Sequence, residues 1–89
     1  MLEFQLYMKF EHFSDWATIR NDLLTHLSTV HNLKVWSELR GLMNNIQIEV
    51  NRLEYLGENA VRERSILVER INSLIEKYRK QSFLLKLKE

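Results

Sequence analysis

Histidine is the side chain best suited to acid–base chemistry near neutral pH, and the chain contains three: His12, His26 and His31. Asp22 stands four residues before His26, and on a helix this spacing would let the carboxylate orient the imidazole. No serine follows at the spacing of a nucleophile elbow, and no His-Glu-x-x-His motif occurs. We therefore expect Asp22 and His26 to form an ordinary pair on a helix surface.

Metal and cofactor chemistry is restricted by what the sequence lacks. Without cysteine, the chain cannot form thiolate zinc sites, iron–sulfur clusters or cysteine nucleophiles. Gly41 and Gly57 are the only glycines, which is too few for a glycine-rich phosphate loop. Glu11, His12 and Asp15 carry possible metal ligands, but groups of this size arise by chance in any chain. We expect no catalytic residue, no cofactor and no metal, and hence no enzyme.

Basic side chains gather toward the end of a chain whose net charge is only +1. In the last turns of a helix they would stabilise the negative end of the helix dipole. Along one edge of a helical hairpin they could instead follow the phosphates of duplex RNA or DNA. The interspersed acids Glu63, Glu69 and Glu76 argue against this second interpretation. The candidate nucleic-acid residues are Arg62, Arg70, Lys77, Arg79, Lys80, Lys86 and Lys88.

The N-terminal segment has the pattern of a strand. Every second residue over 2–10 is apolar, and this spacing puts the apolar side chains on one face of a strand but scatters them around a helix. An isolated strand is unstable, so it would need a pairing edge from the partly alternating tail at 83–87, from a partner, or from its own copy across a two-fold axis. The alternative makes both ends of the chain helical extensions.

Helical spacing begins after Ser14, a good N-cap that is followed by Asp15 in the first turn. The apolar positions that follow predict a helix over 15–29. Polar residues interrupt the pattern near Asn32, which could cap the next helix or adopt a left-handed conformation after the previous one.

A regular heptad predicts a long second helix over 33–56. Gly41 costs this helix about 1 kcal/mol but does not change the phase of the pattern. We expect Gly57 to end the helix in a left-handed conformation, and a broad apolar stripe predicts a third helix over 59–81. The a and d positions of the second helix are Trp36, Leu39, Met43, Ile46, Val50 and Leu53.

A short turn between the helices at 33–56 and 59–81 predicts a long antiparallel helical hairpin with coiled-coil packing. With the short helix at 15–29 before it, the expected fold is mainly α: a three-helix arrangement in a single small domain over 1–89. A chain of 89 residues buries only about two-thirds of its unfolded surface. A partner subunit would therefore help to complete the core.

The helix at 33–56 has a second apolar face. Ile48 and Tyr55 occupy f positions opposite the a/d seam, in the same column as Gly41, and two leucines lie beside them at g. The helix at 15–29 could cover this face within a three-helix bundle, or a second subunit could dock there with Gly41 permitting close approach of its backbone. The candidate interface residues are Leu42, Ile48, Tyr55 and Leu56.

These features predict a small interaction or regulatory protein of adaptor or inhibitor type, which forms a homodimer and packs a helical surface against a protein partner. The alternative function is a helical-hairpin dimer that binds duplex RNA or DNA through its basic stripe. No apolar run is long enough for a membrane-spanning helix or a secretory signal. We therefore expect a protein of the bacterial or host-cell cytoplasm without a membrane partner.

Overall fold

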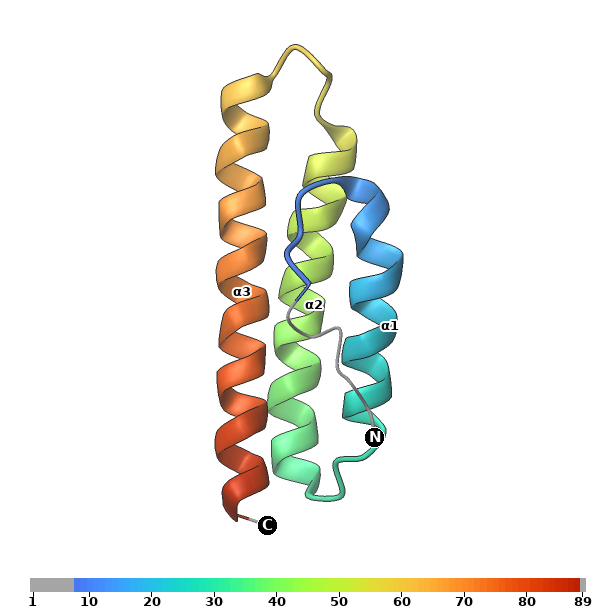
Figure 1. Ribbon diagram of the computed structural model, residues 1–89, viewed down its shortest axis with the longest axis vertical. Helices are drawn as coiled ribbons and strands as arrows, with labels where there is room; N and C mark the ends of the chain where they lie inside the picture. Colours follow the sequence, from blue (N-terminus) through green and yellow to red (C-terminus); the bar gives the residue numbers. More distant parts are fainter. Residues whose placement is uncertain (1–7, 89) are drawn as a thin grey trace.

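The computed structural model describes residues 8–88, and side chains as far as residue 82. Three α-helices follow a 3₁₀ turn, η2 (Phe13–Asp15): α1 (Trp16–Leu27), α2 (Leu33–Tyr55) and α3 (Val61–Lys88). The long helices α2 and α3 lie antiparallel and side by side, and α1 packs against α2 (Figure 1). The predicted three-helix fold built on a helical hairpin is confirmed. Over the described residues, no helix combines the length and apolar character needed to cross a bilayer.

The first helix is shorter than the predicted 15–29, and Ser14 is not its N-cap. Ser14 lies inside η2, where Asp15 Oδ2 accepts the backbone N–H groups of Glu11 at 3.0 Å and His12 at 2.9 Å. These backbone hydrogen bonds, the one from His12 first, lower the pKa of Asp15. The carboxylate therefore fixes the turn that leads into α1, a role that helical periodicity alone does not indicate.

The α1–α2 connection resolves the two alternatives for Asn32. Its Oδ1 accepts the backbone N–H groups of Lys34 at 3.0 Å and Val35 at 3.2 Å, so Asn32 is the N-cap of α2. The helix then runs through Gly41 without a break, as its unchanged heptad phase predicts.

The predicted left-handed conformation at Gly57 is wrong, because no glycine of the described chain has a positive φ. The helix ends instead at an extended Leu56, with φ −72° and ψ 138°. Arg64 of α3 reaches back and donates Nη1 hydrogen bonds to the carbonyl oxygens of Leu53 at 3.2 Å and Leu56 at 3.1 Å. The Leu53 carbonyl is one of those that a left-handed C′ residue helps to satisfy, so the guanidinium takes over part of that role. The third helix begins at Val61 rather than 59.

Most of the strand predicted over 2–10 lies outside the described residues, and the described end, 8–10, is not in a strand. This end is extended along α3 and held there by side chains. Asn72 accepts the Phe10 N–H at 2.9 Å and donates to the Phe10 carbonyl oxygen at 2.7 Å, while Arg79 donates to the Met8 carbonyl oxygen at 2.8 Å. The other end of the chain follows the alternative, since α3 stays helical to Lys88.

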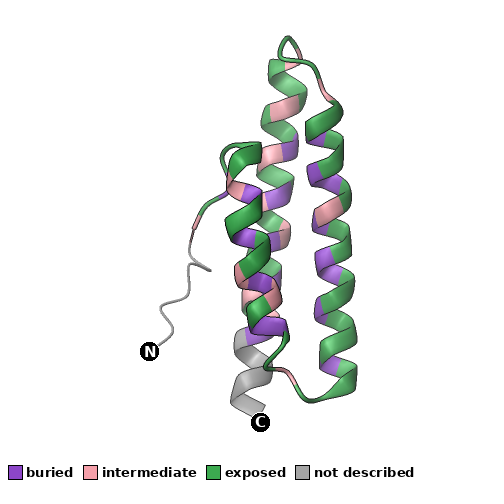
Figure 2. Cartoon of the chain, turned by 90° about the vertical axis from the view of Figure 1, so that its right-hand side faces the viewer, coloured by how far each residue is buried: buried purple, intermediate pink, exposed green. Residues whose placement is uncertain are grey.

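The core lies between the three helices, whose inward faces carry the buried residues in Figure 2. The buried arc of α2 is wider than the predicted a/d seam and is displaced toward g, because α2 contacts both α1 and α3. Val35 is therefore buried while Trp36 remains at the surface. The core side chains of the second and third helices are Val35, Leu39, Leu42, Met43, Ile46, Val50, Leu53, Leu67, Ile71, Ile75 and Tyr78.

The expected surface position of His26 is wrong, because α3 covers this side of α1. His26 is buried, its ring nitrogens lie within hydrogen-bonding distance of the Ser82 hydroxyl, and its ring packs edge-on against Tyr78 at 6.1 Å between centroids. The Tyr78 hydroxyl donates to the Leu23 carbonyl oxygen at 2.9 Å. These contacts make His26 a core residue that joins α1 to α3.

Candidate interaction groove

The four predicted interface residues divide into two pairs. Leu42 is buried in the core, and Leu56 is half-buried against it. Ile48 and Tyr55, seven residues apart on the outer side of α2, stay in solvent with exposed fractions of 50% and 94%. The first helix packs against another side of α2, where the Trp16 Nε1–H donates to Gln47 Oε1 at 3.1 Å. It therefore leaves this apolar face uncovered.

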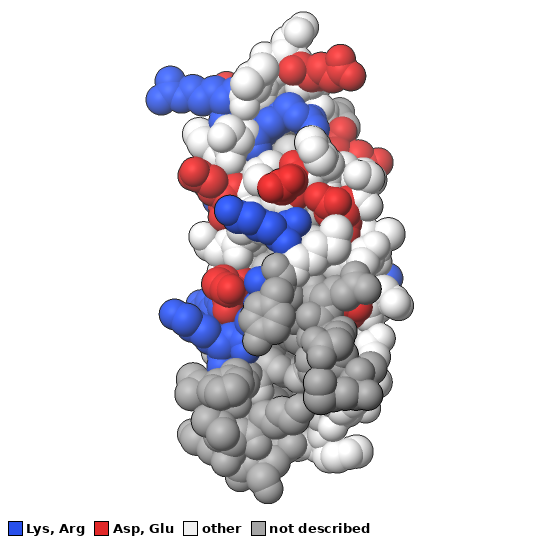
Figure 3. Space-filling view, viewed as in Figure 1, with Lys and Arg blue, Asp and Glu red and all other residues white. Residues whose placement is uncertain are grey.

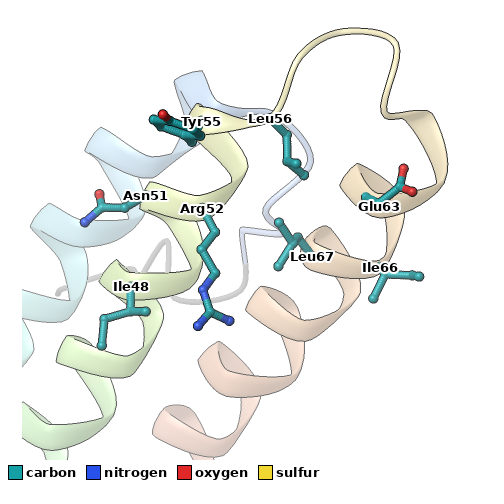
Figure 4. A pocket seen from close by; sticks show the side chains of 8 residues that line it. All are labelled: Ile48, Asn51, Arg52, Tyr55, Leu56, Glu63, Ile66 and Leu67. Carbon is teal, nitrogen blue, oxygen red and sulfur yellow. The ribbon is translucent and has the colours of Figure 1, made fainter.

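A groove of about 680 Å³ lies over this face and continues onto α3. Leu56 and Leu67 lie between the two helices, and Ile48 and Ile66 flank them from opposite sides (Figure 4). Ile66 is 47% exposed, and sequence reasoning missed it. Its signal was an apolar residue outside the buried stripe of its own helix. The lining residues are Ile48, Asn51, Arg52, Tyr55, Leu56, Glu63, Ile66 and Leu67.

A charged cluster that includes the lining residue Arg52 bridges α2 and α3 beside the groove. Glu49, whose side chain is only 12% exposed, accepts hydrogen bonds from Arg52 on its own helix and Arg70 on α3, both at 3.2 Å. Both arginines stay open to solvent, with side chains 62% and 51% exposed. Each contact uses a single Nη1, and a guanidinium has five N–H donors, so donors remain for a further partner.

Among the residues that line the groove, α3 supplies an acidic side chain. Glu63 is exposed in the first turn of α3 and lines the groove across from Arg52. Among the described side chains it has no ion-pair partner within 4.0 Å. The groove therefore has an apolar centre, a basic side chain on one wall and an acidic side chain on the other.

The two described groups whose pKa is shifted lie outside the groove. Within the described part of the chain the shifted groups are Asp15, which holds the η2 turn, and Tyr78, whose pKa is raised by burial. In the same part of the chain no three His, Asp or Glu side chains are close enough to hold a metal ion. The arrangement in the groove offers apolar contact and charge recognition.

The basic candidates are only partly brought together. Helical spacing puts Arg62, Arg70, Lys77 and Lys80 on one outer face of α3, and all four are exposed. Arg79 instead points toward the N-terminal segment, with a side chain 17% exposed that contacts Glu76 and Met8. Lys86 and Lys88 belong to α3, but their side chains are outside the described residues. Figure 3 shows basic and acidic side chains interspersed on one face of the molecule.

Comparison of the chain with protein-family models, with curated proteins and with solved structures gives no match.

Proposed function

We propose that the protein is a small, non-enzymatic interaction protein of the cytoplasm, of adaptor or inhibitor type, whose binding surface is the groove over α2 and α3. The observation that carries this proposal is the exposure of Tyr55, at 94%, beside the half-exposed Ile48 and Ile66. Aromatic and aliphatic side chains that stand together in a groove with a charged rim are the usual anchors of a protein interface. The partner packs a helical surface into the groove.

Burial of these three side chains would supply the main part of the binding free energy. Removing a large apolar side chain from water contributes about 1.5–3 kcal/mol, and Tyr55 can still direct its hydroxyl toward solvent or a partner. Apolar patches that persist on a folded surface with a polar rim mark interaction sites. The rim of Arg52 and Glu63 would select the orientation of the partner rather than add much affinity.

Site-specific cross-linking tests this function. A photo-reactive amino acid at position 55 should form covalent adducts with a protein partner in the native host, and the adducts should decrease when Ile48→Ser and Ile66→Ser are added. The same probe at Thr25, exposed on α1, is the matched control. Adducts at position 55 that are no more abundant than those at position 25 would contradict the proposal.

Nucleic-acid binding is a second candidate, favoured by the shared outer face of Arg62, Arg70, Lys77 and Lys80. Their intervening acids Glu69 and Glu76, and the engagement of Arg70 by Glu49, reduce the positive field there. Binding of duplex RNA or DNA in a gel shift should weaken steeply as salt is raised, because neutralised phosphates release counterions. No shift at low salt would end this candidate function.

A further inference from the structure

We propose that the occupant of the groove is a second copy of this chain, in a two-fold dimer in which α2 of each copy lies over α3 of the other. This inference rests on the proposed function, since it uses the same groove, and it identifies the partner. A two-fold interface uses the same surface on both subunits, so every contact occurs twice. The surface must therefore be complementary to itself.

The charges of the groove meet this requirement. Arg52 stands on the α2 wall and Glu63 on the α3 wall. A two-fold axis that runs along the groove exchanges the two walls, so Arg52 of each copy faces Glu63 of the other. One basic and one acidic side chain thus give two ion pairs between subunits, and they give them only when α2 lies over α3.

The positions of Arg52 and Glu63 along the hairpin axis also allow these ion pairs between copies. The Glu49–Arg70 contact of 3.2 Å puts these two residues at similar heights in the antiparallel pair, and the contacts of Arg64 with the Leu53 and Leu56 carbonyl oxygens agree with this register. Arg52, three residues beyond Glu49, is then level with Leu67, three residues before Arg70. Glu63 is one helical turn from Leu67, or about 6 Å along the axis. Arginine and glutamate side chains span such an offset without a change of backbone.

The net charge of the groove favours a copy over a strongly charged partner. Arg52 and Arg70 are balanced by Glu49 and Glu63, so the described charges along the groove sum to zero. A second copy meets no net repulsion there. In the same arrangement Ile48 and Tyr55 of one copy lie over Ile66 of the other, which covers the apolar side chains left exposed in the single chain.

Charge reversal tests the arrangement by sedimentation equilibrium of the purified full chain. Arg52→Glu and Glu63→Arg should each raise the dimer dissociation constant roughly tenfold or more, because each places two like-charge contacts in the interface. An equimolar mixture of the two variants should dimerise again as a heterodimer, since its contacts are all of opposite sign. Arg40→Glu, an exposed reversal on another side of α2, should leave the dissociation constant within about twofold.

Circular dichroism of every variant establishes that the helical fold is retained. A chain that stays monomeric at all concentrations would overturn the inference, and so would a dimer that neither reversal weakens or whose variants are not rescued by mixing. If the chain is monomeric while position 55 still cross-links a different protein, the proposed function stands and only the second copy is refuted. If position 55 cross-links nothing above its control, both are refuted.

Discussion

Tyr78 shows what a single polar atom does in this core. The side chain is fully buried, and its hydroxyl donates to the Leu23 carbonyl oxygen at 2.9 Å, a contact between α1 and α3. A buried hydroxyl without such a partner would cost free energy. Burial also raises the pKa of Tyr78, because the phenolate would have to form away from water. The stability of the helix packing therefore depends on the Tyr78 hydroxyl staying protonated.

Replacing Tyr78 by phenylalanine separates these two effects. At neutral pH, Tyr78→Phe should lower the free energy of unfolding by about 1 kcal/mol, the usual contribution of one hydrogen bond. The raised pKa in the folded state contributes stability that is complete below the unfolded pKa of 10.0 and is lost as pH rises above it. Between about pH 8 and pH 11, the free energy of unfolding measured in urea should therefore fall more steeply with pH for the wild type than for Tyr78→Phe.

At a concentration at which the chain is monomeric, Tyr55→Phe is the matched control for this measurement, since Tyr55 lies in solvent in the single chain. Its unfolding free energy should fall with pH as steeply as that of the wild type. Equal slopes for Tyr78→Phe and the wild type would contradict the assignment of the alkaline loss to Tyr78.

The pH dependence of stability expected from Asp15 is opposite to that expected from Tyr78, because the loss occurs as pH falls. The His12 and Glu11 amides lower its pKa in the folded state, so its stabilising effect is present above the unfolded pKa of 3.8 and is lost as pH falls below that value. Asp15→Asn keeps an acceptor but removes the charge. Its unfolding free energy should decrease less than that of the wild type between about pH 5 and pH 2. Glu58→Gln, an exposed change in the turn, should keep the wild-type profile.

At the scale of helices, neither glycine has the special role that its position suggests. Gly57 adopts no positive φ, and a Cβ added at either Gly41 or Gly57 would meet nothing within 4 Å. Gly41 lies within α2, where glycine costs backbone entropy without relieving any clash in the single chain. The open space around it leaves this helix position unoptimised for stability.

Gly41→Ala should therefore raise the free energy of unfolding by about 0.5–1 kcal/mol. Chemical denaturation at low micromolar concentration measures this effect on the single chain. Gly57→Ala, in the turn and not in a helix, is the control and should change the stability less. A destabilised Gly41→Ala would mean that the backbone of α2 needs glycine at this position.

The helices could be predicted from sequence because each depends on local spacing. The heptad phase through Gly41 and the cap at Asn32 are both set by neighbouring residues, and the structure contains both. Two of the failures involve contacts between different helices. Arg64 replaces a left-handed turn by reaching back to α2, and α3 buries His26. Helical periodicity does not report which neighbour covers a given side of a helix.

The candidate groove likewise contains residues that the sequence pattern predicts and residues that it does not. Ile48 and Tyr55 were predicted as a surplus apolar face because they fall opposite a regular seam, and they are exposed. Ile66 and the Arg52–Glu49–Arg70 cluster come from the pairing of α2 with α3. The position of α2 relative to α3 along the hairpin axis depends on the length and path of the turn, which the sequence pattern does not define.

At the scale of the whole molecule, self-association would make stability depend on concentration. If only the folded chain dimerises through the groove, the dimer draws the equilibrium toward the folded state by mass action. The Tm of the wild type should then rise as protein concentration increases across the dissociation constant, while that of Arg52→Glu stays nearly constant. Scanning calorimetry at several concentrations measures this. A constant wild-type Tm over the range in which sedimentation shows dimerisation would contradict this coupling.

The hydrogen bonds between Asn72 and Phe10 have a consequence for the order of folding. They join residues 62 positions apart, whereas α2 and α3 are neighbours connected by a short turn. Contacts between distant positions carry a larger loop-closure cost and tend to form late. Asn72→Ala should therefore speed unfolding about tenfold and leave the folding rate nearly unchanged, as stopped-flow chevrons can measure, while Ser73→Ala changes neither rate. The N-terminal segment would thus attach last, to a hairpin that has already formed, and its attachment would slow unfolding.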